Sequence, residues 1–203
     1  MYIPKHFESP DPALTLEVMR RHNFASLTTT DTDGAPFATH LPVVVGESEG
    51  VVTLYFHLAR ANPQVAMLRG GRQSMLAFVG PHAYMSPKVY PDLKRVPTWN
   101  YIAVHAYGAV QEIVEPEDKD ALLKSLIAVH EPLYAQQWKD LDPKFQETML
   151  GAIAAFRMTV TRLEGKFKIN QHRKEAHAAM KAGYAVGTTD ERELGHWLER
   201  LGL

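Results

Sequence analysis

The sequence YMSPKVYPDLKRVPTWNY, residues 84–101, decides how the rest of the chain is interpreted. It places three tyrosines, one tryptophan and three prolines between two apolar stretches that are typical of strands. The prolines rule out a continuous helix or a central strand, and the aromatic content argues against disorder. A loop of this length in a compact domain usually has a function. We therefore expect residues 84–101 to form the wall of a binding site or of a subunit interface.

The composition predicts one globular domain with extensions. The chain has 203 residues, of which 45% are hydrophobic, and its formal net charge is −1. A charge this close to zero gives no electrostatic attraction to nucleic acid or to an anionic membrane. The chain has no cysteine, which excludes disulfides, thiolate metal sites and cysteine nucleophiles. No apolar run reaches the roughly 20 residues of a membrane-spanning helix, and the start lacks the apolar core of a signal peptide. We expect a soluble, cytoplasmic protein.

The first part of the chain predicts an antiparallel meander of three strands. Residues Phe24–Thr30 alternate and are rich in β-branched side chains, which is typical of a strand. A hairpin turn follows that ends at Gly34, where glycine tolerates a positive φ. The second strand is expected at Pro36–Val45, interrupted by Pro42, and the third at Val51–His57.

Further strands alternate with helices along the rest of the chain. Strands are predicted at residues 74–79, 102–114 and 156–163, and helices at residues 12–22, 63–69, 117–130, from 143 onward, 171–182 and 189–201. About six antiparallel strands with helices between them predict a mainly β fold with helices (α+β), a small β-barrel with the C-terminal helices packed outside. We expect a barrel domain over residues 1–165, with a helical stretch inserted at about residues 116–155. A C-terminal helical extension should follow over residues 166–203.

A candidate phosphate site lies in residues 57–63, HLARANP, where a strand ends and a helix begins. Free backbone N–H groups at a helix start, together with the guanidinium of Arg60, suit a phosphate. Asn62 is expected to cap this helix, with Pro63 in its first position. The alternative is an exposed arginine beside an ordinary helix cap.

Two further features suit a planar ligand. In Thr39-His40-Leu41-Pro42 the proline removes one donor from a strand, which frees neighbouring backbone groups for the edge of a ligand. The alternative there is an edge strand with a bulge. After Pro97, a planar ligand could stack on Trp99 while Asn100 bonds its heteroatoms. The alternative is that Trp99 is buried in a dimer core. A dimer core does not exclude ligand binding, so the two interpretations are compatible.

Several other functions lack the residues they need. The ten histidines show no metal-binding spacing, because His130-Glu131 has Tyr134 where the HExxH motif requires its second histidine. The chain has no serine in a GxSxG elbow and no phosphate loop. The last predicted helix carries four acidic residues against two arginines, a net charge of −2, so it would be repelled by DNA phosphates. Its apolar residues instead predict a packing face: Leu194, Trp197, Leu198 and Leu201.

Five motifs in register resemble the PaiB family, FMN-binding split-barrel proteins often labelled negative transcriptional regulators. The motifs are MYIPKHF at 1–7, HLP at 40–42, HLARANPQ at 57–64, GPHAYMSPKVY at 80–90 and VPTWNY at 96–101. The resemblance runs from Met1 to about Gly108 and returns in KFKINQHR at 166–173. It implies a homodimer of split β-barrels of about six strands, with FMN bound in two equivalent sites at the interface.

The resemblance also implies roles for individual residues. Arg60 and Asn62 would hold the flavin phosphate, with His57 at the end of the same strand. The isoalloxazine ring would be lined by Thr39, His40, Leu41 and Pro42, with Thr28 on the adjacent strand as a further candidate. The other subunit would supply Trp99 and Asn100, and the pocket would be closed by Tyr84 and Ser86.

The sequence departs from the family pattern at two places. Val89 stands where the family has an aromatic residue, which removes one stacking surface. Residues 168–172 read KINQH where the family favours KLSQN, so a cofactor role does not carry over to this segment.

Three functions remain open from the sequence. The first is a flavin protein, an oxidoreductase in which FMN performs the electron chemistry and His40 and His57 are candidates for moving protons. The second is a negative transcriptional regulator that uses FMN as a sensor, which the charge balance does not favour. The third is a split barrel that binds haem or another cofactor.

Overall fold

The computed structural model describes residues 1–71 and 73–203, and it consists of two compact units whose segments alternate along the chain. Unit 1 comprises Met1–Arg21, Val79–Val104 and Glu164–Leu203. Unit 2 comprises His22–Phe78 and His105–Leu163. Three strands, β5, β6 and β8, run from one unit into the other.

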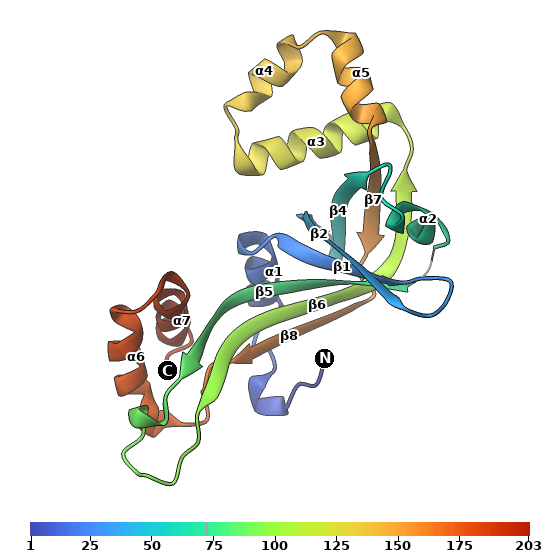
Figure 1. Cartoon of the computed structure of the whole chain (residues 1–203). Coiled ribbons are helices and arrows are strands. Elements are labelled where there is room, and N and C mark those ends of the chain that lie inside the picture. Colours follow the sequence, from blue (N-terminus) through green and yellow to red (C-terminus); the bar gives the residue numbers. More distant parts are fainter. Residues whose placement is uncertain (72) are drawn as a thin grey trace. The chain divides into compact units, whose positions relative to one another are not determined.

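The sheet contains eight strands among the described residues, with α2 to α5 inserted between strands, α1 before the first strand and α6 and α7 after the last (Figure 1). The strands are β1 (Phe24–Thr30), β2 (Pro36–Pro42), β3 (Val44–Ser48), β4 (Val51–Ala59), β5 (Gln73–Met85), β6 (Thr98–Ile113), β7 (Ile153–Thr159) and β8 (Arg162–Lys168). Hydrogen-bonded neighbours follow the order β2-β1-β5-β6-β7-β4-β3, and β8 pairs with β6. The pairs with an assigned register are antiparallel, which confirms the predicted α+β fold with an antiparallel sheet. In the described part of the chain the sheet is not closed, because β2 and β3 are its two ends.

The core of unit 2 follows from the alternation of side chains along each strand. In β4, Leu54, Phe56 and Leu58 are buried on one face, and Phe56 stacks on Phe156 of β7 with 5.9 Å between the ring centroids. The residues between them, such as Tyr55 and His57, lie on the other face of the same strand. One face of β4 therefore builds the core and leaves the other face for a site.

Four helices belong to unit 2: α2 (Gln64–Arg69), α3 (Pro116–His130), α4 (Tyr134–Asp140) and α5 (Pro143–Gly151). The last three lie together between β6 and β7 (Figure 1). The helix α5 begins as the sequence predicts, with Pro143 in its first turn and the side chain of Asp142 accepting a hydrogen bond from the backbone N–H of Phe145. The sequence did not predict α4.

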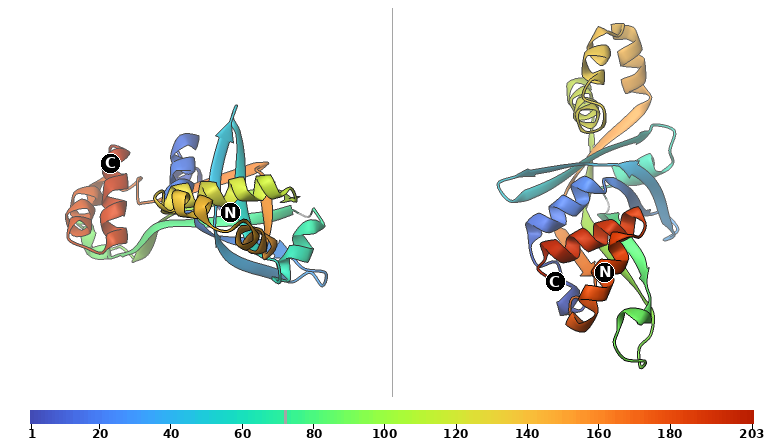
Figure 2. Two further views of the ribbon diagram at one scale, coloured as in Figure 1. Left: turned by 90° about the horizontal axis from the view of Figure 1, so that it is seen from above. Right: turned by 90° about the vertical axis from the view of Figure 1, so that its left-hand side faces the viewer.

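Unit 1 contains α1 (Pro12–Arg21), α6 (His177–Ala185) and α7 (Thr189–Arg200), together with the short 3-10 helices η1 (Lys5–Phe7), η2 (Pro87–Val89) and η3 (Lys174–Ala176). The helices α6 and α7 pack side by side (Figure 2). The predicted packing face of α7 is confirmed, because Leu194, Trp197 and Leu198 are fully buried and Leu201 is partly buried. Trp197 meets Phe167 of β8 edge-on at 5.4 Å. A capping box between Thr188 and Glu191 fixes the start of α7.

The structure corrects three strand boundaries. The strand predicted at Pro36–Val45 is two strands, β2 and β3, which are separated at Val43, where the backbone N–H bonds to the carbonyl of Asn23. The strand predicted to end at Val79 continues through Pro81 to Met85. Its assigned pairing with β1 reaches only Ala77, so Pro81 lies beyond the part of β5 that needs donors for β1.

The strand predicted at Phe156–Leu163 is also two strands, β7 and β8. The chain changes partner between them, since Val160 donates to the carbonyl of Val52 in β4 while Thr161 donates to that of Tyr107 in β6. Only glycine fits beside this crossing, because a Cβ on Gly108 would lie 2.3 Å from the carbonyl oxygen of Thr159. The number of strands is therefore larger than the six predicted.

The predicted tail helix at 171–182 begins later, as η3 followed by α6. None of the helices in the described ranges is both long enough and apolar enough to span a membrane.

Candidate functional site

The predicted site residues fall into two sets, one in each unit. Unit 2 contains Thr28, Thr39, His40, Leu41, Pro42, His57, Arg60 and Asn62, and unit 1 contains Tyr84, Ser86, Trp99 and Asn100. Within unit 2, hydrogen bonds link some of these residues directly. In unit 1, two of the four contact each other and the other two make separate contacts.

Asn62 joins the start of α2 to β2. Its side-chain Oδ1 accepts a hydrogen bond from the backbone N–H of Gln64 at 2.9 Å, which forms a turn just before α2. The predicted cap is wrong by one residue, because Pro63 occupies the N-cap position and α2 begins at Gln64. Its Nδ2 donates to the hydroxyl of Thr39 at 3.0 Å. Asn62 and Thr39, which were predicted from separate motifs, are therefore in direct contact.

Arg60 is exposed, but its guanidinium is held in place. Nε donates to the carbonyl of Gly151 at 2.6 Å and Nη2 to that of Ile153 at 3.1 Å. These bonds use two of the five N–H donors of the side chain, and no carboxylate pairs with it among the described residues. The nearby carboxylate of Glu112 is bound at both oxygens by Arg69, at 2.7 and 2.8 Å.

Gln64 is a site residue that the sequence analysis missed. It is fully buried, and its Nε2 donates to the carbonyls of Leu27 and Phe37 and to the hydroxyl of Thr29, at 3.1 to 3.2 Å. It thereby fixes β1 and β2, the strands that carry Thr28 and Thr39. The signal was present, because Gln64 is the last residue of the HLARANPQ motif.

β2 is an edge strand in the described part of the sheet, as the alternative interpretation of Pro42 predicted, but its register with β1 is continuous and contains no bulge. It pairs only with β1, in a register that places Thr39 opposite Leu27 and His40 opposite Ser26. The Nδ1 of His40 lies 2.7 Å from the hydroxyl of Ser26, and the imidazole is exposed. The outer edge of β2 therefore offers backbone N–H and C=O groups to a ligand.

His57 lies on β4 with its ring largely buried. Burial lowers the pKa of His57 and favours the neutral imidazole. Its Nδ1 has no hydrogen-bond partner among the described residues. A buried polar atom without a partner is unusual in a native fold and is typical of functional positions.

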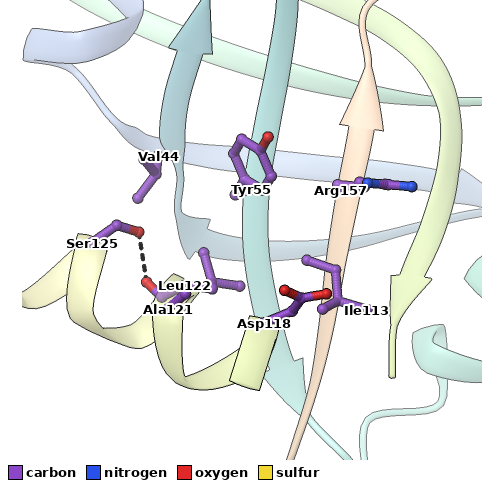
Figure 3. Close-up of a pocket in the computed structure, with 8 residues that line it drawn as sticks. All are labelled: Val44, Tyr55, Ile113, Asp118, Ala121, Leu122, Ser125 and Arg157. Carbon is purple, nitrogen blue, oxygen red and sulfur yellow. Dashed lines mark hydrogen bonds between the residues drawn. The ribbon is translucent and has the colours of Figure 1, made fainter. Parts of the chain in front are cut away.

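A cavity of about 390 Å³ lies between α3 and the same face of the sheet (Figure 3). Its apolar part is formed by Val44, Ile113 and Leu122, and the Tyr55 ring stands beside them. Polar groups at the rim come from Asp118 and Arg157. The volume falls within the range of small-molecule pockets, roughly 300–1,000 Å³. The sequence did not predict this cavity, because α3 reads only as an ordinary amphipathic helix.

In unit 1, Tyr84 and Trp99 form an exposed aromatic surface. Their rings meet edge-on at 6.3 Å, and 52% of Tyr84 and 49% of Trp99 are exposed to solvent. The indole Nε1 of Trp99 donates to Nδ1 of His82 at 3.3 Å, which holds the indole in one orientation. This part of residues 84–101 has the form of a wall available to a ligand or a subunit.

Asn100 and Ser86 have structural contacts. Asn100 is buried, and its Nδ2 donates to the hydroxyl of Tyr184 in α6 at 2.9 Å, while its Oδ1 has no partner among the described residues. Ser86 caps η2 by accepting a hydrogen bond from the backbone N–H of Lys88 at 3.2 Å. Asn100 therefore connects β6 to the C-terminal helices.

Comparison with known proteins identifies the family. The family model described as "Putative FMN-binding domain" matches residues 1–162. The chain is 32% identical over 180 residues to "Protease synthase and sporulation protein PAI 2" of Bacillus subtilis, and the match covers 86% of this chain and 84% of that protein.

Solved structures share the fold at low sequence identity. The flavocytochrome Anf3 from Azotobacter vinelandii has a TM-score of 0.61 at 16% identity, over 82% of this chain and 72% of that one. The FAD and heme binding protein from Mycobacterium smegmatis has a TM-score of 0.61 at 16% identity, over 79% and 73%. These likenesses bear out the predicted split-barrel fold class, and the family model supports FMN as the cofactor. The chain belongs to the PaiB-type family of FMN-binding domains.

Proposed function

We propose that this protein binds FMN in a homodimer and that its flavin site is built on β2, the end of β4 and the start of α2. The observation that carries the proposal is the hydrogen bond between Asn62 and Thr39 beside the exposed, anchored guanidinium of Arg60. The proposed role of the bound flavin is redox chemistry or redox sensing.

The residues present fit the phosphate of FMN. The guanidinium of Arg60 keeps three N–H donors for a ligand, and Glu112 does not neutralise it because Arg69 occupies that carboxylate. Asn62 and Thr39 add an amide and a hydroxyl that are already aligned with each other. Because both groups are held before binding, little side-chain entropy is lost when the phosphate arrives.

The ring of the flavin is assigned to the edge of β2. Backbone groups of residues 39–42 are available there, since β2 has no further strand on its outer side among the described residues. Thr28 on β1 stands opposite Ala38 and supports the same strand. FMN supplies the electron transfer when bound, and the protein binds and orients it. His57, neutral because of burial, can accept or hold a proton at Nδ1.

The aromatic wall is assigned to the other half of the dimer. Trp99 of the partner subunit, with Tyr84 beside it, would cover the flavin, and Ser86 and Asn100 would support that wall through η2 and α6. This assignment depends on the homodimer.

A role as a DNA-binding regulator has less support. Helix α7 carries four acidic residues against two arginines, a net charge of −2, and the net charge of the chain is −1. Both features oppose contact with phosphates.

Two experiments test flavin binding, an absorbance spectrum and the substitution of Arg60. Protein supplied with FMN should keep bands at about 370 and 450 nm after the unbound FMN has been removed by gel filtration. Arg60→Ala should weaken FMN binding by about 1.5–3 kcal/mol, the range of a lost charge-assisted hydrogen bond. Arg60→Gln keeps a donor for the carbonyls of residues 151 and 153 but removes the charge, so it separates binding from local folding.

Lys139→Ala is the matched control, because it removes one exposed positive charge on α4 and leaves the Arg69–Glu112 pair beside Arg60 intact. It should leave the dissociation constant of FMN unchanged. An Arg60→Gln protein that is folded and binds FMN like the unmodified chain would remove Arg60 from the site, and the absence of any flavin bands would overturn the proposal as a whole.

A further inference from the structure

A second, smaller cavity lies in unit 1 beside the KINQHR segment, which the flavin site does not use. Its volume is about 160 Å³. One side is basic, with Lys168, His172 and Arg173, and the other side is apolar and aromatic, with Phe7, Tyr90 and Val96. We call this cavity the 168–173 pocket.

The turn that carries the basic side is rigidly held. Asn170 adopts a left-handed conformation with φ of 64°, and its Oδ1 accepts a hydrogen bond from the hydroxyl of Tyr90 at 3.2 Å. The carbonyl of Asn170 lies 3.1 Å from Nε2 of the buried His177 in α6. Gln171 donates from Nε2 to the carbonyl of Phe167 at 2.6 Å. The basic side chains therefore project from a fixed backbone, not from a mobile loop.

The positive charge of the pocket is not neutralised by the protein. Nζ of Lys168 donates to the hydroxyl of Thr98 and the carbonyl of Trp99, two neutral acceptors, and keeps one N–H. The guanidinium of Arg173 has no hydrogen bond or ion pair with any described residue. Glu175, the acidic group that acts on this region, is bound by Arg95 at 3.2 Å.

The lowered pKa of His172 reflects the same excess of positive charge. Burial lowers the pKa of His172, and the charges of His6, Arg173 and Lys168 lower it further, while Glu175 opposes them. Burial and the charge of Lys166 also lower the pKa of Lys168. An anion in the pocket would relieve this repulsion.

The size and the walls select the kind of anion. A volume of about 160 Å³ is below the roughly 300 Å³ at which pockets for drug-sized ligands begin. The exposed side chain of Val96 and the half-buried Tyr90 ring would remain poorly covered by an inorganic ion, but they would pack against the body of an organic one. A planar carboxylate also matches the donor geometry of an arginine.

We propose that the 168–173 pocket binds a small organic carboxylate, with the carboxylate between Lys168 and Arg173 and the apolar body against Tyr90 and Val96. None of the residues proposed to hold the flavin phosphate lines this pocket, and the proposal does not depend on the proposed function, although Asn100, which supports the proposed aromatic wall, is also among the lining residues.

Benzoate is the probe, benzamide is its neutral counterpart of the same shape, and inorganic phosphate is the anion without an apolar body. Titration calorimetry on the full chain should show that benzoate binds and that benzamide and phosphate bind at least about tenfold more weakly, the effect of about one lost charge-assisted contact. Equal binding of benzamide would overturn the role of the charge. Tighter binding of phosphate would overturn the assignment to an organic carboxylate, and no binding of benzoate would overturn the site.

Arg173→Gln is the main variant, because its side chain makes no bond that the fold needs. It should weaken benzoate about tenfold or more and leave FMN binding unchanged. Lys168→Met should also weaken benzoate about tenfold or more, provided that circular dichroism shows a native fold. FMN affinity is compared only for Arg173→Gln, because Lys168 also holds the carbonyl of Trp99. Lys174→Met is the matched control, since Lys174 is exposed in the same segment and does not line the pocket.

If Lys174→Met weakened benzoate as much as Arg173→Gln, the attraction would be general charge and not a site. If Arg173→Gln weakened FMN and not benzoate, these residues would be flavin ligands and the proposal would be wrong. A failure of FMN to bind to any variant or to the unmodified chain would instead count against the proposed function alone.

Discussion

Two side-chain amides, Gln64 in unit 2 and Asn100 in unit 1, are equally buried but donate their hydrogen bonds to different kinds of partner. Both are at most 1% exposed, both donate from the amide nitrogen, and both leave the amide oxygen without a partner among the described residues. Gln64 donates to the backbone of β1 and β2, the strands of the proposed flavin site. Asn100 donates to Tyr184 in α6, a helix of the C-terminal segment.

Gln64 therefore shapes the proposed site, whereas Asn100 attaches α6 to the sheet. Gln64 fixes the strands on which predicted ligands lie, although it was not itself predicted as a ligand. Asn100 was predicted as a ligand from its place after Trp99, but its nitrogen is committed to a helix. Stability and flavin affinity should therefore respond differently to changes in the two regions.

The largest expected effect is on Gln64. Gln64→Leu removes the donor from two backbone carbonyls and a buried hydroxyl, so the free energy of unfolding should fall by about 3 kcal/mol. Urea denaturation measures it. Gln73→Leu, at an exposed glutamine of β5, should change stability by less than about 0.5 kcal/mol. A Gln64→Leu protein as stable as Gln73→Leu would show that the amide does not hold the strands.

The next effect is on the attachment of α6. Asn100→Ala should lower the free energy of unfolding by about 2 kcal/mol and Tyr184→Phe by about 1 kcal/mol, because each removes one side of the same buried hydrogen bond. The double variant should lose less than the sum of the two. Full additivity in a double-mutant cycle would mean that the two side chains do not interact.

A substitution at Asn62 can separate its effect on stability, through the turn before α2, from its effect on FMN affinity. Asn62→Asp keeps the oxygen that accepts from Gln64, so stability should change by less than about 0.5 kcal/mol. It loses the donor to Thr39 and adds a negative charge beside Arg60, so FMN affinity should fall about tenfold. Gln136→Glu adds the same charge on the exposed face of α4 and should not alter affinity. Unchanged affinity in Asn62→Asp would place the phosphate elsewhere.

The smallest effect is the pH dependence that His57 contributes. Its pKa in the folded protein is below the ordinary value of 6.5 in the unfolded chain, so the unfolded state takes up protons first as the pH falls. The stabilising contribution is therefore complete above about pH 6.5 and is lost as the pH drops toward the folded pKa. Between about pH 7.5 and pH 5.5, His57→Gln should lose less stability than the unmodified chain.

His172→Gln is the comparison for that measurement, because partial desolvation and nearby positive charges also lower the pKa of His172, but it is more exposed than His57. It should alter the pH dependence less than His57→Gln. The same slope in the unmodified chain and in His57→Gln would assign the pH effect to other groups.

The sequence predicted elements whose signals are local. The hairpin pairs β1–β2 and β3–β4, the start of α5 after Asp142 and the apolar face of α7 all follow from alternation, caps and spacing, and the structure confirms them. The predicted three-strand meander was wrong, because its middle strand is divided into β2 and β3 at opposite ends of the strand order. Predicted boundaries failed where a long-range contact decides them. Val160 and Thr161 split β7 from β8 by bonding to different strands, and nothing in the sequence around them records which strands those are.

The candidate site shows the same limit. Thr39 and Asn62 were found because their motifs are distinctive, but their hydrogen bond depends on β2 meeting α2 across 23 residues. The partners of Arg60 are carbonyls 91 and 93 residues further on, and backbone carbonyls have no signature in a sequence. Gln64 was missed because a buried glutamine and an exposed one look alike in the sequence.

The three helices α3, α4 and α5 leave the sheet at Ile113 and return to it at Ile153, and Ile113 pairs directly with Ala155 across β6 and β7. Without these helices, β6 and β7 would be an ordinary hairpin that a short turn could close. The two ends of the helical segment are therefore neighbours in the sheet. A segment of another length could take its place without changing the register of β6 and β7. The segment ends at Gly151 and Ile153, whose carbonyls hold the guanidinium of Arg60. Replacing the segment would therefore change the position of Arg60 in the proposed flavin site without altering any side chain of that site.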